Sequence, residues 1–274
     1  MAVTSGPGDG NGDRNGDGVG VGAASGPGGT GAAASGPGEL VDAAPEPGAA
    51  PARRHAPFVL DTRWTPVYWL ARRTVELVVR VWFRPRIVGR DNVPGTGPVV
   101  LAPVHRSFAD FVFTAVLTDR KLFFMAKDSL WSSRVLTRIL PIVGAFPVHR
   151  EAADREAMSR AEAVLREGQV LVMFPEGTRQ QGTDVQSLHD GVAFLAARTG
   201  APMVPIGIGG SDRSMPKGSK IPKPIRIDLV VGEPVPPPAR GAGGRVSRSK
   251  LRETTEALRG AIQAVYDRAR TPAG

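Results

Sequence analysis

The fold is decided by the stretch PVVLAPVHRSFAD at residues 98–110, where an apolar run gives way to a helical pattern. The run from Pro98 to Pro103 is short, apolar and bounded by turn residues, which is typical of a buried strand. His105 follows this run closely, and Asp110 stands five residues further on. The end of a buried strand is where an α/β protein would place a general base and the carboxylate that orients it.

A second motif, FPEGTR at residues 174–179, also follows an apolar run. Between and beyond the two motifs, strand and helix patterns alternate at a spacing that predicts a mostly parallel sheet flanked by helices. Lys127 and Arg150 end two further apolar segments. Because ligands of such sheets bind beyond the carboxyl ends of the strands, we expect His105, Lys127, Arg150 and the second motif to gather at one edge.

The chain divides into three parts by composition. Residues 1–57 are dominated by Gly, Ala, Pro, Ser and Asp, with too little apolar surface to offset chain entropy, and we interpret them as a disordered tail. Residues 58–235 form the predicted domain. Residues 236–274 hold a Pro- and Gly-rich linker and a helix with an apolar stripe.

Charge separates the tail from the domain. Residues 1–50 contain six acidic residues and one basic residue, so the whole-chain charge of +9 leaves +14 for residues 51–274. A strongly basic domain suits nucleic acid, anionic lipid headgroups or phosphorylated substrates. No nucleic-acid-binding motif is present, and aromatic residues make up only 6% of the chain, which disfavours the first partner.

The chain has no cysteine. This excludes disulfides, thiolate metal sites and a cysteine nucleophile, and it suits a reducing compartment. The N-terminus shows no signal-peptide pattern, and no uninterrupted apolar run reaches the length of a membrane-spanning helix.

A helix is predicted near residues 64–83. Its apolar residues recur at three- and four-residue spacing, with charged residues across from them. The stripe comprises Trp64, Val67, Tyr68, Ala71, Val75, Val78 and Trp82. Tryptophans facing one way and arginines the other favour a membrane-docking helix at an interface, while a helix packed on its own domain fits the stripe equally well.

The residues at the strand ends suggest acid–base chemistry beside positive charge. A neutral imidazole can accept the proton of an attacking alcohol, and a carboxylate on its other ring nitrogen fixes the tautomer. His105 and Asp110 fit these roles; alternatively, they are a turn histidine and an aspartate near a helix N-terminus, with Ser107 as the N-cap. Lys127, Arg150 and Arg179 suit a phosphate, or are scattered surface charges of a basic chain.

Four blocks in this order carry a family resemblance. They are His105-x4-Asp110 with Ser107 in the third place, GAFPVHR at residues 144–150, FPEGTR at 174–179 and Val204-Pro205-Ile206. Together they resemble the glycerolipid acyltransferases, the family of 1-acyl-sn-glycerol-3-phosphate acyltransferase, over about residues 64–235.

The resemblance implies a reaction and a set of roles. His105 would be the general base and Asp110 its partner. The glycerol phosphate would be bound by Lys127, Arg150, Glu176, Gly177, Thr178 and Arg179. The family uses neither metal nor cofactor: a lysophosphatidic acid hydroxyl attacks the thioester of acyl-CoA or acyl carrier protein directly, with no acyl-enzyme. The family's membrane-docking element favours an anionic membrane surface for residues 64–83, at the cytoplasmic face of the cell membrane.

Two residues depart from the usual pattern of the family, and they leave the identity of the acyl acceptor open. Val104 stands where the family often has Asn, and His149 stands where an acidic or amide residue is common. The His-Arg-Ser-aromatic order is also similar to glycerol-3-phosphate acyltransferases. The alternatives are therefore an acyltransferase for glycerol 3-phosphate or another lysophospholipid, and, in another class, a non-catalytic module that binds anionic lipid.

Overall fold

The computed structural model describes residues 65–148, 154–216, 219, 221–241 and 245–271. These residues all fall within one compact unit. The predicted tail at 1–57, Trp64, His149 and Arg150 lie outside the described residues, so what the sequence predicts for them stays a prediction.

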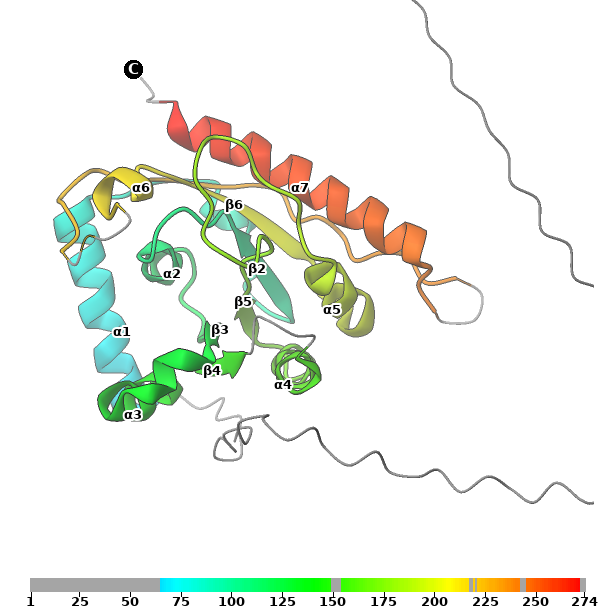
Figure 1. The fold of residues 1–274 in the computed structure, drawn as a ribbon, viewed down its shortest axis with the longest axis horizontal. Coiled ribbons are helices and arrows are strands. Elements are labelled where there is room, and N and C mark those ends of the chain that lie inside the picture. Colours follow the sequence, from blue (N-terminus) through cyan, green and yellow to red (C-terminus); the bar gives the residue numbers. More distant parts are fainter. Residues whose placement is uncertain (1–64, 149–153, 217–218, 220, 242–244, 272–274) are drawn as a thin grey trace, which may run out of the picture. The chain divides into compact units, whose positions relative to one another are not determined.

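The described residues build a seven-stranded sheet with the order β1-β7-β6-β2-β5-β3-β4 (Figure 1). Its strands are β1 (Arg86–Val88), β2 (Val99–Pro103), β3 (Leu122–Lys127), β4 (Ala145–Val148), β5 (Val170–Val172), β6 (Met203–Gly209) and β7 (Asp228–Val231). All neighbouring pairs are parallel except β6 and β7. The predicted α/β class with a mostly parallel sheet is confirmed.

Helices connect and cover these strands. The α-helices are α1 (Pro66–Val78), α2 (Asp110–Phe113), α3 (Arg134–Ile142), α4 (Arg155–Arg166), α5 (Gly191–Thr199), α6 (Ser211–Ser214) and α7 (Arg248–Arg270). A π-helical turn, η1 (Val79–Phe83), continues α1, and short 3-10 turns are η2 (Arg90–Asn92), η3 (Thr114–Val116) and η4 (Asp128–Ser132).

The helices form two layers around the sheet. On one side α4, α5 and α7 contact one another in series, and α7 packs along β6 and β7. On the other side lie α1 and α2 (Figure 1). There Phe83 at the end of η1 meets Phe113 edge to face, with ring centroids 5.0 Å apart. The helix at the end of the chain is thus packed on the sheet, with Leu258 and Ile262 buried in the main core.

Strand β2 runs through the middle of this sandwich. All five of its residues are buried, as its continuous apolar sequence predicts for a strand covered on both faces. It pairs with β5 through Val100 and Leu171 and with β6 through Val100 and Met203. Because these strands are parallel, their carboxyl ends meet at the edge where His105 emerges.

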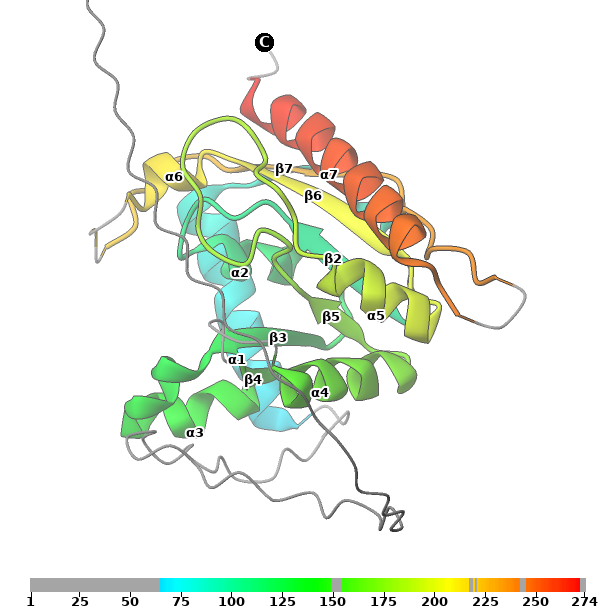
Figure 2. The ribbon, with the colours of Figure 1, turned by 45° about the vertical axis from the view of Figure 1, so that its right-hand side comes forward.

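A long segment between β5 and α5 arches over this edge (Figure 2). It touches the residues that follow β2: the Gln180 N–H donates to the His105 carbonyl at 2.9 Å. At its far end the Val185 N–H donates to the Gln263 side chain of α7 at 2.7 Å. The arch therefore links the end of β2 to the C-terminal helix.

Helix α1 has an unusual distribution of polarity. Thr65 caps its first turn, accepting from the Tyr68 N–H at 3.1 Å. The buried face carries Tyr68, Arg72 and Glu76, and the exposed face is mostly apolar. Its exposed apolar residues, with those of η1, are Val67, Trp69, Leu70, Leu77, Val78, Val81 and Trp82.

The predicted apolar stripe of this helix is therefore partly wrong. Tyr68 is only 4% exposed, whereas Val67 is 59% exposed, so the two residues do not share a face. Buried charge explains the difference: Arg72 donates to the Ala115 and Arg120 carbonyls at 3.0 and 2.9 Å and pairs with Glu76 at 2.8 Å. A hydrophobicity pattern cannot place an arginine that satisfies carbonyls of its own domain. No helix in the described ranges is long and apolar enough to span a membrane.

Candidate active site

His105 and Asp110 lie in the turn between β2 and α2. The His105 Nδ1 atom is 3.1 Å from the Asp110 Oδ2 atom, and the side chains are 9% and 0% exposed. An imidazole whose Nδ1 faces a carboxylate carries its proton there, which leaves Nε2 as the basic nitrogen. Within the described residues, Nε2 has no hydrogen-bond partner. The pair has the geometry of a general base and its orienting carboxylate.

Asp110 is held by the backbone that it organises. Besides His105, its Oδ2 atom accepts the N–H groups of Arg106 and Ser107, each at 2.6 Å. Helix α2 begins at Asp110 with no side-chain cap, so the predicted N-cap role of Ser107 is wrong. The reason is that the Asp110 carboxylate takes the amides, while the Ser107 hydroxyl accepts from the Ala109 N–H and donates to the Met215 carbonyl, both at 3.3 Å.

Two apolar contacts fix the imidazole and the strand before it. The ring of Phe174 stacks on His105 with centroids 4.1 Å apart. Val104 is fully buried, and its N–H donates to the Ile206 carbonyl of β6 at 2.9 Å. The residue that departs from the usual family pattern thus extends the β2–β6 pairing and packs in the core.

Glu176 lies against the backbone of His105. Its Oε2 atom accepts the His105 N–H at 2.9 Å, and both of its oxygens accept from the Arg106 Nη1 atom at 2.8 and 2.9 Å. Its Oε1 atom also accepts the Gln186 N–H at 3.2 Å. The residue is 4% exposed. The structure therefore brings Glu176 to His105, with its carboxylate bonded to groups of the protein.

Gly177 turns the chain just after Glu176. Its φ of +71° lies in the left-handed region, and a Cβ atom there would come within 2.7 Å of the His189 ring. The Thr178 N–H donates back to the Glu176 carbonyl at 2.8 Å. Glycine is required at this position because other residues adopt this backbone conformation at a cost. The turn sends residues 178 and 179 toward solvent.

The remaining predicted residues are less closely tied to His105. Thr178 and Arg179 are exposed, and Arg179 makes no ion pair within the described residues. Lys127 is exposed at the carboxyl end of β3, beyond the pairing of Phe124 with Val172 of β5. It shares the edge with His105 but makes no contact with it. Arg150 lies outside the described residues.

One residue of the site was missed by sequence reasoning. Arg106 is 8% exposed and bonds to Glu176, His105, Gly182 and Asp184. Its guanidinium also lies 5.0 Å from the centre of the Tyr266 ring of α7. The sequence offered one hint of its role, namely its position beside His105. An arginine in so basic a chain is otherwise expected to be a surface residue.

An apolar ledge lies beside the catalytic turn. Phe108 and Phe111 are 46% and 38% exposed, although both belong to the buried region after β2. Their rings meet edge to face at 5.5 Å, and Phe111 meets Phe124 of β3 at 6.1 Å. The exposed aromatic pair forms an apolar surface close in sequence to the His105–Asp110 pair.

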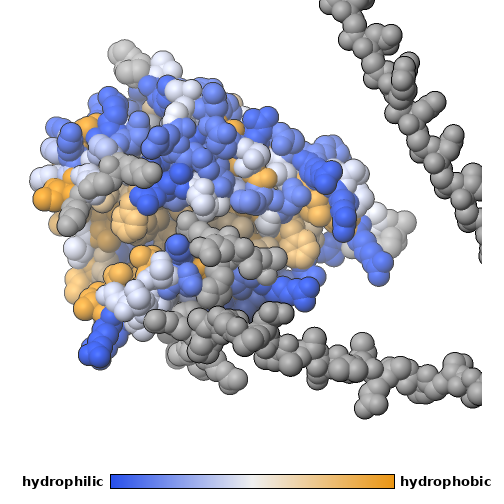
Figure 3. Space-filling view, viewed as in Figure 1, coloured by the Kyte–Doolittle hydropathy of each residue, from blue (hydrophilic) through white to orange (hydrophobic). Residues whose placement is uncertain are grey.

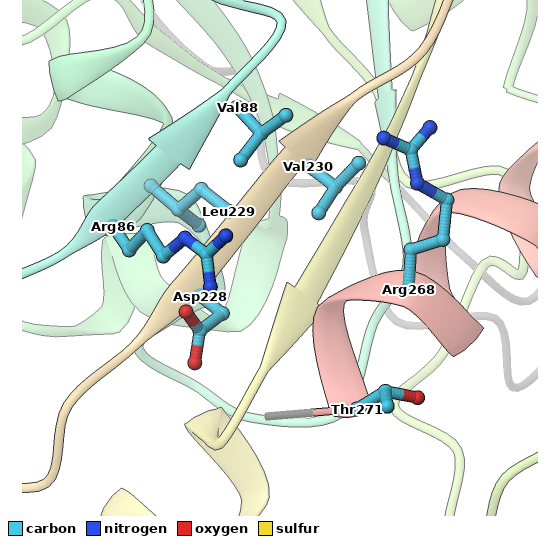
Figure 4. Close-up of a pocket in the computed structure, with 7 residues that line it drawn as sticks. All are labelled: Arg86, Val88, Asp228, Leu229, Val230, Arg268 and Thr271. Carbon is cyan, nitrogen blue, oxygen red and sulfur yellow. The ribbon is translucent and has the colours of Figure 1, made fainter. Parts of the chain in front are cut away.

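A cavity of about 120 Å³ lies elsewhere, between β1, β7 and the last turn of α7 (Figure 4). Arg86 and Asp228 line it from the two strands and Arg268 from the helix. None of the predicted site residues that the structure describes lines this cavity. The chemistry of the strand ends therefore has a separate location.

The fold and the site together define an α/β domain with a buried histidine–aspartate pair and exposed positive charge at the carboxyl edge of its sheet. Residues 84–209 match the Acyltransferase family, and this range contains the whole His105–Glu176 cluster.

Several named proteins are similar to this chain, with sequence identities of 24% to 32%. A 1-acyl-sn-glycerol-3-phosphate acyltransferase of Bacillus subtilis is 25% identical over 170 residues, which cover 62% of this chain and 82% of that protein. The Streptococcus pneumoniae protein of the same name is 32% identical over 149 residues, 53% of each chain. The chloroplastic enzyme of Arabidopsis thaliana is 24% identical over 193 residues, covering 69% of this chain and 54% of that protein. The chain thus spans about half the length of the plant relatives that it matches.

A solved structure has the same fold. The crystal structure of the 1-acyl-sn-glycerophosphate acyltransferase of Thermotoga maritima superposes with a TM-score of 0.59 at 24% identity, covering 76% of this chain and 82% of that one. The two proteins share the arrangement of sheet and helices.

Proposed function

We propose that the chain is an O-acyltransferase that transfers a fatty acyl group from acyl-CoA or acyl carrier protein to the sn-2 hydroxyl of 1-acyl-sn-glycerol 3-phosphate, giving phosphatidic acid. The observation that carries this proposal is the buried His105–Asp110 pair, whose Nε2 is free of partners in the described part of the chain. The names of the bacterial and plant relatives support the acceptor.

The geometry of the pair supports the following mechanism. The His105 Nε2 atom accepts the proton of the acceptor hydroxyl as its oxygen attacks the thioester carbonyl. A new C–O bond forms, the C–S bond breaks, and the leaving sulfur takes the proton from the imidazolium. Asp110 keeps the proton of Nδ1 in place and stabilises the transient positive charge. Such assistance accelerates a reaction by about 100- to 10,000-fold.

Positive charge at the same edge suits the phosphate of the acceptor. Arg179 is exposed and has no ion pair among the described residues, so its guanidinium is available to an anion. Lys127 at the end of β3 adds a second charge, and Arg150 is proposed as a third. Thr178 supplies a hydroxyl beside Arg179. The exposed rings of Phe108 and Phe111 would receive the acyl chain.

Replacing Arg179 by Glu tests the phosphate role. The Arg179→Glu variant should raise the KM for lysophosphatidate about tenfold or more, because a charge-assisted contact becomes a repulsion, while basal thioester hydrolysis changes little. The matched control is Arg252→Glu, the same change at an exposed residue in the first half of α7. Equal loss of transfer and hydrolysis in Arg179→Glu would contradict the role.

A panel of acceptors separates the alternatives within the enzyme class. CoA release is measured with lysophosphatidate, glycerol 3-phosphate and other lysophospholipids at equal concentrations. The proposal expects lysophosphatidate to give the highest kcat/KM. A preference for glycerol 3-phosphate would move the assignment to that acceptor, which the His-Arg-Ser order also permits. Vesicle binding without transfer to any acceptor would favour the non-catalytic module.

We propose that the apolar face of α1 and η1 rests on an anionic membrane surface, at the cytoplasmic face of the cell membrane. Leu70, Leu77 and Val81 are 62%, 62% and 65% exposed. Figure 3 shows apolar side chains gathered on the side of the domain where α1 and α3 lie. A row of exposed apolar residues in a domain with net positive charge matches the chemistry of an interface with anionic lipid. The lack of cysteine suits the reducing side of the membrane.

Sedimentation with vesicles tests this surface. The double variant Leu70→Asp and Leu77→Asp should lose binding to phosphatidylglycerol-containing vesicles by about tenfold or more, because it places charge in the apolar boundary. Phe194→Asp is the control, since Phe194 is 41% exposed on α5, in the other helical layer. Raised salt should weaken wild-type binding. Unchanged binding by the double variant would remove α1 from the membrane surface.

A further inference from the structure

The backbone of His105 is held at both ends by one ion pair. Glu176 accepts its N–H at 2.9 Å, and Arg106 donates to its carbonyl at 3.1 Å. The two side chains are each 1% exposed and pair with each other at 2.8 Å. The imidazole is fixed separately by Asp110, so the constraints on side chain and backbone come from different residues.

Arg106 also carries this constraint to distant segments. Its Nε atom donates to the Gly182 carbonyl at 3.2 Å, and its Nη2 atom donates to the Asp184 carbonyl at 3.0 Å. On its other side the guanidinium faces the Tyr266 ring of α7, and burial raises the pKa of the Tyr266 hydroxyl. Arg106 therefore connects the catalytic turn to the arch over the sheet edge and to the C-terminal helix.

We infer that Arg106 and Glu176 are positioning residues for the general base: together they fix the backbone of His105 and supply a balanced pair of charges beside its ring. The Glu176 carboxylate then serves His105 rather than the substrate. Within the described residues, its oxygens accept hydrogen bonds from Arg106, His105 and Gln186. A carboxylate at this place would also repel a phosphate unless its charge were neutralised, and Arg106 neutralises it.

Removing either charge of the Arg106–Glu176 pair should shift the protonation of the His105 ring, and the two removals should shift it in opposite directions. The charged groups that face His105 are Asp110 and Arg106 on its own turn and Glu176 from the segment after β5. The phenol of Tyr266 on α7 lies beyond Arg106. Removing the negative charge of Glu176 leaves Arg106 uncompensated and disfavours an imidazolium, whereas removing Arg106 leaves two carboxylates and favours it.

The experiment compares Glu176→Gln, Arg106→Gln and the double variant. The acid limb of the pH profile of kcat/KM should move to lower pH in Glu176→Gln and to higher pH in Arg106→Gln, each on the order of one pH unit. It should return close to the wild-type position in the double variant. Each single variant should lose about 100-fold in kcat with KM changed less than about threefold, because the base is displaced and not removed. The Arg106→Lys variant should have its acid limb close to the wild-type position, because the positive charge is kept. Its kcat should stay below that of the wild type, because lysine lacks the forked donors of arginine.

The kinetic readout rests on the proposed acyl transfer, so a second readout is independent of it. The chain has four histidines, and the ring signal of His105 can be assigned by its loss in His105→Gln. The midpoint of this ring titration, followed by NMR, should shift in the same opposite directions. The control is Glu162→Gln, which breaks a carboxylate–arginine cluster on α4 and α5 and should leave the midpoint unchanged.

Each outcome decides the inference. Opposite shifts that cancel in the double variant support it, even in a protein that transfers no acyl group to any acceptor. Shifts of the same sign, or no shift in folded variants, overturn it. If Arg106→Gln does not fold, the direction of the shift in Glu176→Gln alone decides, because that change keeps the shape of the side chain and an acceptor for the His105 N–H.

Discussion

At the scale of residues, the site depends on a few buried polar groups that hydrogen-bond to one another. The Asp110 Oδ2 atom accepts one ring nitrogen and two backbone N–H groups, and Glu176 accepts a third backbone N–H from the same turn. Buried carboxylates with this many donors are fixed in position. The turn between β2 and α2 is therefore organised before any substrate binds.

Replacing Asp110 by Asn separates its charge from its shape. The amide oxygen can still accept the Arg106 and Ser107 N–H groups, but it no longer holds the His105 tautomer or stabilises an imidazolium. We expect kcat to fall by about 1,000- to 10,000-fold with little change in KM, measured by steady-state kinetics. Asp119→Asn, at a carboxylate whose side chain is 78% exposed, is the control and should keep full activity. A fall of less than about tenfold in Asp110→Asn would argue against the general-base assignment.

At the scale of elements, α1 is held to the domain by a charge buried beneath its apolar outer face. Arg72 and Arg73 both pair with Glu76, at 2.8 and 3.0 Å, but their side chains are 5% and 57% exposed. The proposed membrane contact would need such an anchor, because the exposed apolar residues of α1 are turned away from its own core.

The two arginines form a matched pair for mutation. Arg72→Leu should lower the free energy of unfolding by about 3 kcal/mol or more, because it leaves Glu76 and several carbonyls without their buried donor. Arg73→Leu should change it by less than about 1 kcal/mol, since exposed pairs contribute little. Urea unfolding measures both. Equal effects would show that α1 is not anchored through Arg72.

The contact between α7 and the sheet depends on glycine. A Cβ atom at Gly207 of β6 would come within 2.2 Å of the Val265 carbonyl of α7. Gly207→Ala should therefore lower the melting temperature and cost about 3 kcal/mol through overpacking. Gly260 on the same helix has nothing within 4 Å, so Gly260→Ala should stabilise by about 0.5 to 1 kcal/mol. Stabilisation by both changes would mean that α7 packs less closely in solution.

These elements also show how far sequence reasoning reaches. The strand before His105 was predicted because a sheet covered on both faces requires a continuous apolar run, and all five residues of β2 are buried. The buried and exposed faces of α1 were not predicted correctly, because Arg72 satisfies carbonyls about 43 to 48 residues away. Arg106 was not predicted as a site residue for the same reason, because its partner Glu176 lies 70 residues further along the chain. Periodicity describes apolar faces and contains no signal for a buried charge whose partner is remote in sequence.

At the scale of the whole molecule, His105, the exposed aromatic rings and the proposed membrane face of α1 belong to connected elements. The carboxyl edge of the sheet carries His105, the proposed base, and the exposed rings of Phe108 and Phe111 follow it in the chain. Helix α1 packs on η3, which follows α2 directly, so the proposed membrane face belongs to the same layer as the catalytic turn. A lipid acceptor at a bilayer surface would thus reach His105 from the layer that contacts the bilayer.

The most direct test of acyl transfer follows one oxygen atom. Lysophosphatidate labelled with ¹⁸O at the sn-2 hydroxyl is incubated with long-chain acyl-CoA, and the lipid product is analysed by mass spectrometry. The account predicts phosphatidic acid that keeps the label in its new ester, because the acceptor oxygen attacks the thioester, and it predicts at least 100-fold less product with His105→Gln. Absence of phosphatidic acid with the wild-type protein, or equal product with the variant, would contradict it.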